Sequence, residues 1–248
     1  MAQTIKTIGV VLKSNKHTIE ASRLLEIFSP ELGKIRAVIR GVEKPKAKLA
    51  SASQPFCFGE FMLAEKNGFY TVTDCYIQDS FYQLAYNLDK YVLASSMLEA
   101  TSKLVQENEK NLSLFTLLLN CLKVLVYENA EPTAVAIKYF IKCLNLSGVG
   151  FELEHCQKCG KELLKESRIG LVYEDIGALC LEHCVGNNFL MLTTTEWGIL
   201  KNIYNNEVDK LAKMLFSSRE SLTEVLKLVL KQFYYRTNER LISLEKYF

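Results

Sequence analysis

Two close pairs of cysteines are the residues whose types and spacing best suit chemistry, and that chemistry is metal binding. Cys156 and Cys159 are separated by two residues, and after twenty more residues Cys180 and Cys184 are separated by three. A turn inside each pair can bring its two sulfurs together, and four thiolates close the tetrahedral shell that zinc prefers. The spacing therefore predicts one structural zinc ion held by these four cysteines.

Two histidines beside these cysteines offer an alternative ligand set. His155 or His183 could replace one sulfur in a site of three cysteines and one histidine. We expect both to stay outside the shell, because four cysteines already complete it and leave no open position for a catalytic water. A redox Cys-x-x-Cys motif is a competing interpretation, but it would not need Cys180 and Cys184. Buried packing is the expected role of the other cysteines, Cys57, Cys75, Cys121 and Cys143.

The segment around the paired cysteines also carries strand patterns. Arg168–Glu174 and Gly177–Cys180 are predicted as two short strands, joined through Asp175–Gly177. Such a hairpin would carry the second cysteine pair back to the first. We therefore predict a zinc ribbon within residues 151–190, which its metal helps to fold.

Strand-forming residues dominate the first 77 positions. Asn67-Gly68 lies between two strand patterns and is a strong hairpin signal. The predicted strands are Thr4–Lys13, Thr18–Phe28, Gly33–Arg40, Gln54–Glu65 and Phe69–Tyr76. No connection is long enough for a series of crossover helices, so we predict a small antiparallel barrel. Five strands with an insertion at Val42–Ser53 match the pattern of an OB-fold.

From Ser80 onward the apolar residues recur at helical spacing. Pro132 marks one helix start, and Thr193 with Glu196 forms a capping box at another. The predicted helical stretches are residues 84–105, 112–127, 132–146, 193–204, 207–215 and 218–234. The expected fold class is α+β, with an OB-fold nucleic-acid-binding domain at residues 1–79 and a helical domain at residues 80–248 that carries the zinc segment.

A cluster of cations suggests a surface for nucleic acid. The net charge is only +2, so such a surface must be local. Within fifteen positions, opposed only by Glu43, the sequence carries Lys34, Arg36, Arg40, Lys44, Lys46 and Lys48. We expect them to hold phosphates along the barrel, with Lys13 extending the track. Phe58 and Tyr70 are candidates for base stacking, although packing in the core is the competing interpretation for both.

Several function classes find no support in the sequence. It contains no glycine-rich phosphate loop, no paired histidines at helical spacing and no nucleophile elbow, so we do not expect an enzyme. No apolar run reaches the length of a membrane span, and the first residues lack the pattern of a signal peptide. Together with the metal-binding cysteine pattern, this predicts a protein of the reducing cytoplasm.

The order of these motifs resembles the bacterial recombination mediator family RecO. The segments that carry the resemblance are Thr7–Leu12, Ala21–Ser29, Leu32–Ile35, Val38–Val42, Pro55-Phe56, Phe140 before Gly148, and Cys156–Gly160 followed by Cys180 and Cys184. The similarity spans the whole chain. It implies an OB-fold joined to a helical domain with a zinc ribbon.

The resemblance also implies a function and partners. Members of the family bind single- and double-stranded DNA, anneal complementary strands and, with RecR, help to load RecA onto DNA covered by single-strand-binding protein. The implied partners are therefore DNA, RecR, the C-terminal tail of single-strand-binding protein and, indirectly, RecA, and the implied location is the bacterial nucleoid. One departure is the tail at Glu239–Lys246, where acids interrupt a region that is basic in many members. An RNA-binding or protein-interaction adaptor is the alternative function.

Overall fold

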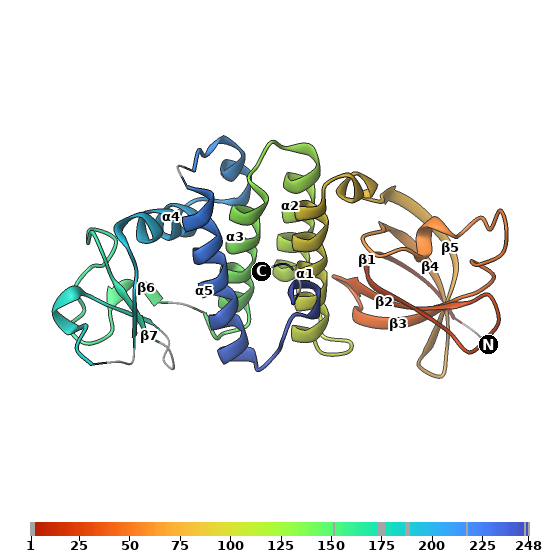
Figure 1. The fold of residues 1–248 in the computed structure, drawn as a ribbon. Coiled ribbons are helices and arrows are strands. Elements are labelled where there is room, and N and C mark those ends of the chain that lie inside the picture. Colours follow the sequence, from red (N-terminus) through yellow and green to blue (C-terminus); the bar gives the residue numbers. More distant parts are fainter. Residues whose placement is uncertain are drawn as a thin grey trace. The chain divides into compact units, whose positions relative to one another are not determined.

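The computed structural model describes residues 3–150, 152–172, 177–186, 189–216, 218–245 and 247. The chain forms two compact units: unit 1 is Met1–Leu122 with Leu241–Phe248, and unit 2 is Lys123–Arg240. Figure 1 colours the chain from red at the N-terminus to blue at the C-terminus. Unit 1 contains the barrel predicted for residues 1–79 together with the first helix that follows it. A domain boundary at residue 79 stays a prediction.

Unit 1 begins with a closed five-stranded barrel, which confirms the predicted OB-like architecture. The strands are β1 Gln3–Lys16, β2 Arg23–Ser29, β3 Gly33–Ile39, β4 Phe58–Lys66 and β5 Phe69–Asp79. They follow the order β1-β2-β3-β5-β4, and β4 pairs with β1 to close the barrel. All pairs are antiparallel except β3 with β5, which is parallel over three residue pairs. The interior holds buried apolar side chains from every strand, among them Val11, Leu25, Ile35, Phe61 and Val72.

The second strand is shorter than predicted. The prediction began at Thr18, but β2 begins at Arg23, and the residues before it form a turn. Ala21 adopts φ 53°, in the left-handed region, and the main-chain N–H of Ile19 donates to His17 Nδ1 at 3.1 Å. A residue at positive φ interrupts an extended strand, so the β-branched residues of this stretch do not decide its structure.

Short helices and two long ones complete unit 1. They are η1 Ser51–Ser53, η2 Tyr82–Tyr86, α1 Leu88–Leu104, α2 Leu112–Tyr127, which crosses into unit 2, and η5 Ile242–Leu244. The single helix predicted from residue 84 is divided at Asn87, whose side chain accepts from the N–H of Lys90 and caps α1. Phe115 of α2 makes edge-to-face contact with Phe28 of the barrel, with ring centroids 5.6 Å apart.

Unit 2 contains three whole α-helices and the end of α2 among its described residues. The whole helices are α3 Pro132–Leu146, α4 Thr194–Asn205 and α5 Arg219–Thr237, with the 3-10 helix η4 Val208–Lys213 between the last two. The predicted capping box at Thr193 and Glu196 is present with both of its hydrogen bonds. Phe140 of α3 packs against Phe233 of α5, and Trp197 is buried with its Nε1 donating to the carbonyl oxygen of Glu166 at 3.0 Å.

A small sheet in unit 2 carries the paired cysteines. Its strands are β6 Glu152–Cys156, β7 Gly170–Val172, β8 Gly177–Leu179 and β9 Phe189–Met191, in the order β6-β8-β7-β9. β7 and β8 pair antiparallel, as predicted for the ribbon. Residues 173–176, the end of the first predicted strand and most of the predicted connection, lie outside the described residues. Over the part of the chain described, no helix is long and apolar enough to span a membrane.

Candidate functional site

Four side chains in unit 2 form a cluster that could hold a metal ion. The ligand atoms of Cys156, Cys159, Cys180 and His183 all lie within 4.8 Å of one another. The Cys159 and Cys180 sulfurs are 3.8 Å apart, and the Nδ1 atom of His183 lies 3.7 Å from Cys156 Sγ. Three soft sulfurs and one imidazole nitrogen form one of the common ligand sets of structural zinc sites.

Local structure explains how these ligands meet. Cys156 ends β6, and the N–H of Gly160 donates to its carbonyl oxygen at 2.8 Å, which closes the turn that presents Cys159. Gly160 has φ 73°, where a residue with a Cβ is disfavoured. Cys180 directly follows β8, and β8 pairs parallel with β6. The sheet therefore brings the second half of the site to the first.

The fourth ligand position differs from the expectation from sequence. Cys180 is followed by a 3-10 helix, η3 Leu181–His183, in which side chains three residues apart lie on the same side. His183 therefore points back toward Cys180, and its Nδ1 lies 3.2 Å from Cys180 Sγ. Cys184, one residue further around, lies outside the cluster, and its Sγ is 3.8 Å from the carbonyl oxygen of Leu179. In the sequence, the three-residue spacing of Cys180 and His183 was the signal that these two side chains could meet on one side of a 3-10 helix.

His155 lies at the surface beside Glu152. Its side chain is exposed, and its Nδ1 lies 3.9 Å from a carboxylate oxygen of Glu152. It does not belong to the metal-ligand cluster.

Proton binding differs between two thiols of the cluster. Burial raises the pKa of the Cys156 thiol, but hydrogen bonds from the backbone of Cys180, Cys159 and Lys158 outweigh burial and lower that pKa to about 6. Burial, followed by the neighbouring thiols of Cys156 and Cys159, raises the pKa of Cys180 to about 11. A bound metal ion would replace the protons that these thiols otherwise share.

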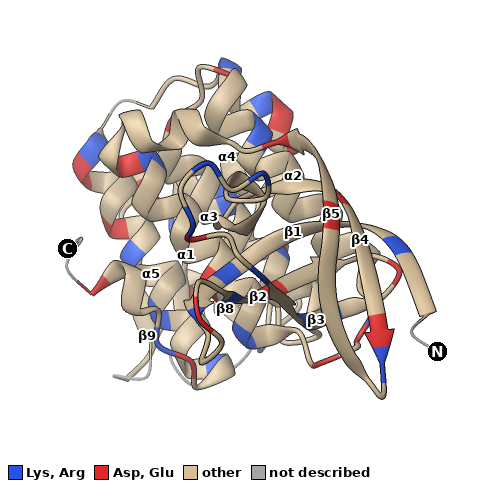
Figure 2. Cartoon of the chain, turned by 90° about the vertical axis from the view of Figure 1, so that its right-hand side faces the viewer, with Lys and Arg blue, Asp and Glu red and all other residues tan. Residues whose placement is uncertain are grey.

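The cations of the predicted phosphate track differ in exposure and in their contacts with other residues. Arg40, after β3, and the three lysines of the following loop, Lys44, Lys46 and Lys48, are exposed. Lys48 lies 3.6 Å from Asp74 with its side chain 84% exposed, a contact that solvent weakens. Figure 2 shows blue and red segments interspersed on this side of the protein. We name Arg40 and these three lysines the basic loop.

The remaining predicted cations differ from the basic loop. Lys34 is half-buried on β3, and its Nζ donates to the carbonyl oxygen of Ser102 in α1. Arg36 is exposed but lies 2.9 Å from Glu107. Lys13 is half-buried on β1. Sequence alone could not reveal the contacts of Lys34 and Arg36, because both partners lie about seventy residues away in the chain.

The aromatic residues chosen for stacking pack inside unit 1. Phe58 is 9% exposed, with its ring centroid 6.3 Å from that of Phe115. Tyr70 is half-buried against the barrel core. Packing, the competing interpretation, therefore describes both residues. Other aromatic side chains of unit 1 are exposed, including Tyr82 and Tyr86.

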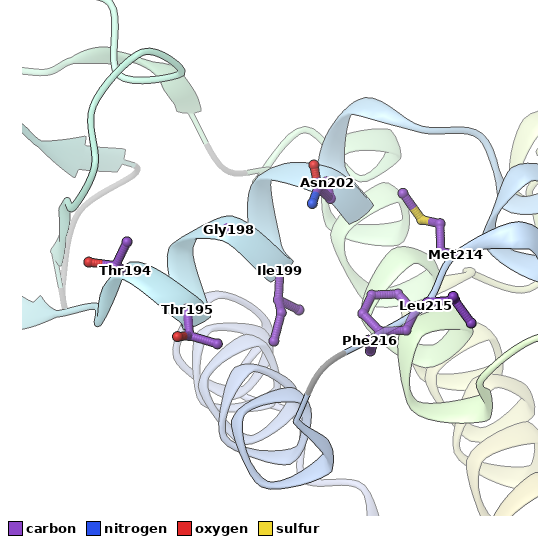
Figure 3. A pocket seen from close by; sticks show the side chains of 8 residues that line it. All are labelled: Thr194, Thr195, Gly198, Ile199, Asn202, Met214, Leu215 and Phe216. Atoms are coloured by element: carbon purple, nitrogen blue, oxygen red, sulfur yellow. The ribbon is translucent and has the colours of Figure 1, made fainter.

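A groove with mixed polar and apolar walls lies on unit 2. One wall is a face of α4, with Thr194, Thr195, Gly198, Ile199 and Asn202, and the other is the segment Met214–Phe216; the cavity is about 520 Å³. Figure 3 shows Ile199 on the helix and the Met214, Leu215 and Phe216 side chains across from it. Leu215 is 99% exposed. A single exposed apolar side chain is normal on a protein surface, so the groove as a whole, and not Leu215 alone, is the candidate binding site.

Comparison with known proteins decides the family. Residues 1–81 match the family model described as Recombination protein O N terminal, and residues 85–245 match Recombination protein O C terminal. The chain belongs to the RecO family. The two matches cover the barrel and nearly all of the remaining chain.

Curated relatives of the RecO family agree over almost their whole length. A protein of Caldicellulosiruptor saccharolyticus named DNA repair protein RecO is 30% identical over 229 residues, 92% of this chain and 91% of the relative. One of the same name from Clostridium perfringens is 26% identical over 243 residues, 97% of both chains. A third, from Desulforamulus reducens, is 30% identical over 92% of this chain and 87% of its own. These likenesses confirm the resemblance and place the chain in a family of DNA repair and recombination proteins.

Proposed function

We propose that this chain is a DNA-binding recombination mediator in DNA repair. It binds single- and double-stranded DNA, promotes annealing of complementary strands and, with RecR, helps to load RecA onto DNA covered by single-strand-binding protein. It acts without catalysing a covalent reaction, in the bacterial cytoplasm and in association with the nucleoid. Membership of the RecO family is the observation that carries this proposal.

The basic loop supports the DNA-binding part of the proposal. Its four cations are exposed on a barrel whose strand order is that of an OB-fold, a fold that often binds single strands in a groove. Contacts of Lys and Arg with phosphates are independent of sequence, as annealing of arbitrary strands requires. Arg36 and Lys13 extend this surface, whereas Lys34 is used to join β3 to α1.

We further propose one structural zinc ion per chain, held by Cys156, Cys159, Cys180 and His183. The donor set and the short separations of its atoms support this choice over the set with Cys184. Zinc at this position would tie β6 and the residues after β8 together. Its role is folding of the small sheet, since four protein ligands leave no open position for chemistry.

The groove between α4 and Met214–Phe216 supports a partner-binding role. The C-terminal tail of single-strand-binding protein is acidic and apolar, so its site should combine apolar walls with nearby cations. Exposed Lys210 and Lys213 immediately precede the Met214–Phe216 wall in the sequence. We propose that the tail binds in this groove. A pull-down with immobilised tail peptide tests this, because Leu215→Asp should be retained less than the wild type. Equal retention of both proteins would contradict the proposal.

An annealing assay tests the proposed function as a whole. Complementary fluorescent oligonucleotides should anneal faster with the protein, and the acceleration should fall as salt rises because phosphate contacts are screened. A protein that binds neither strand and leaves the annealing rate unchanged would contradict the proposal. Equal competition by RNA and DNA without annealing would instead indicate an RNA-binding or protein-interaction adaptor.

A further inference from the structure

We infer that an aromatic cavity in unit 1, next to the basic loop, receives a base of single-stranded nucleic acid. This inference rests on the proposed DNA-binding function and adds to it a site for bases rather than phosphates. The cavity has a volume of about 310 Å³ and is lined by residues of two segments, 51–56 and 80–91. Both segments belong to unit 1.

The lining suits a nucleobase. Tyr82 and Tyr91 contribute exposed aromatic rings, whereas Phe56 is 6% exposed and supports Tyr91 by edge-to-face contact, with centroids 5.8 Å apart. Tyr82 is 60% exposed, so its ring is accessible from solvent. Any base can stack on an aromatic ring because every base has a π-face. Gln54 adds an amide that can hydrogen-bond to the edge of a base.

The backbone of the cavity is held in an unusual conformation. Phe56 has φ 70° and Phe81 has φ 47°, both in the left-handed region that large side chains rarely adopt. The N–H of Phe56 donates to the carbonyl oxygen of Val11 at 3.0 Å, and the N–H of Phe81 donates to Asp79 at 2.8 Å. Strained positions of this kind concentrate at binding sites, and here both line the same cavity.

Nearby positive charge favours an anionic occupant, and the aromatic lining favours one that carries planar bases. The basic loop leads into the cavity wall, because Lys48 precedes the lining residue Ser51 by only three positions. Among the described residues that line the cavity, none is acidic. A polyanion whose phosphates contact Lys48 would therefore reach the segment that contributes Ser51 to the cavity wall. An acidic, apolar peptide is the other class of ligand that this surface could attract.

Strands with and without bases separate these possibilities. The wild-type chain should bind a short oligothymidylate roughly 5- to 150-fold more tightly than an abasic strand of the same length, as expected for stacking of one base. Tyr82→Leu should reduce this ratio to about one and leave affinity for the abasic strand unchanged. Tyr82→Phe, which keeps the ring, should retain the preference. Tyr127→Leu is a matched control, since Tyr127 is 59% exposed and lies outside the cavity.

Each outcome decides one claim. If the wild type binds neither strand, the proposed DNA-binding function fails and the inference fails with it. If the wild type binds both strands equally, or if Tyr82→Leu keeps the preference for bases, DNA binding stands and the base site is wrong. In that second case, an acidic, apolar peptide that binds the wild type but not Tyr82→Leu would identify a peptide as the occupant. Thermal melting of each variant shows whether the fold is intact.

Discussion

His183 Nδ1 lies 3.2 Å from Cys180 Sγ, three residues before it, and this proximity determines which side chain completes the metal-ligand cluster. Because η3 turns back after Cys180, we expect His183→Ala to lower zinc affinity strongly. The loss should be at least about 100-fold, since even outer partners of metal ligands are worth about 10- to 100-fold. Zinc content and competition with a coloured chelator measure it.

Cys184→Ser is the matched control for the ligand set. It should keep one zinc per chain, and the cobalt-substituted protein should keep the charge-transfer absorption of three thiolates. If Cys184→Ser empties the site while His183→Ala fills it normally, the four-cysteine set expected from spacing is correct and the observed cluster is not the bound arrangement.

Removal of the metal should unfold the small sheet selectively. The free energy of metal binding is free energy of folding for such a segment, so a chelator should expose the amides of β6–β9 to hydrogen exchange. The amides of β1–β5 should keep their protection, because the barrel has its own buried core. Hydrogen exchange with mass spectrometry, with and without chelator, tests this, and equal loss of protection in the barrel would contradict it.

Replacing the three lysines of the basic loop should weaken DNA binding at all sequences. Each lost phosphate contact lowers the slope of log affinity against log salt by about 0.7 to 0.9, so Lys44→Ala, Lys46→Ala and Lys48→Ala together should lower it by about 2 to 3. A salt series of anisotropy titrations measures the slope. The control carries the same charge change at other exposed lysines, Lys110, Lys210 and Lys213. An equal effect of both triple variants would show that net charge, not the loop, controls binding.

Lys34 and Arg40 should behave differently although both were expected in the same track. Lys34→Ala removes a hydrogen bond from a charged donor to Ser102 and should lower the free energy of unfolding by about 1 to 3 kcal/mol. Arg40→Ala should leave stability within about 0.5 kcal/mol and weaken DNA binding. Urea unfolding and anisotropy titration of both variants provide the comparison. Normal stability of Lys34→Ala with weakened DNA binding would restore Lys34 to the track.

Glu99 gives unit 1 a defined dependence on acid. Burial raises the pKa of its carboxyl group, but hydrogen bonds from Ser243 and Ile242, and then from Lys103, outweigh burial and hold the pKa below its ordinary value of 4.5. A lowered pKa means that this stabilisation is present above pH 4.5 and is lost as pH falls through the folded-state value. Glu99→Gln should therefore be less stable than the wild type at pH 7, by about 1 to 3 kcal/mol, and equal to it in strong acid. Unfolding experiments across this pH range measure the difference in free energy of unfolding between the two proteins. A difference that does not change with pH would contradict the assignment.

The sequence predicted the elements whose signals are local. The Asn67-Gly68 hairpin, the cap at Thr193 and the proline at the start of α3 each depend on a few neighbouring residues, and all are present. The barrel was predicted from the strand patterns of residues 1–77, because short connections allow few arrangements of five strands.

The errors lie where distant contacts or turn geometry decide. Thr18–Ser22 has strand-forming residues but forms a turn, since Ala21 takes a left-handed conformation. Residues 207–215 form a 3-10 helix only over Val208–Lys213. The contact of Lys34 with α1 could not be predicted because it depends on residues far away in the chain, and a role for Lys34 in DNA binding stays a prediction. From the sequence, His183 was an alternative ligand and Cys184 the preferred one, because counting cysteines took no account of the three-residue period of η3. Which of the two binds the metal stays a prediction.

The return of the last residues to unit 1 has a consequence for synthesis on the ribosome. Glu99 of α1 accepts hydrogen bonds from Ile242 and Ser243, and Asp89 accepts one from Tyr247, yet all of unit 2 is translated between these partners. While a nascent chain is still growing, its N-terminal unit therefore waits for residues 242–247. Synthesis of these residues, rather than emergence of the barrel, is the step that allows unit 1 to complete its contacts.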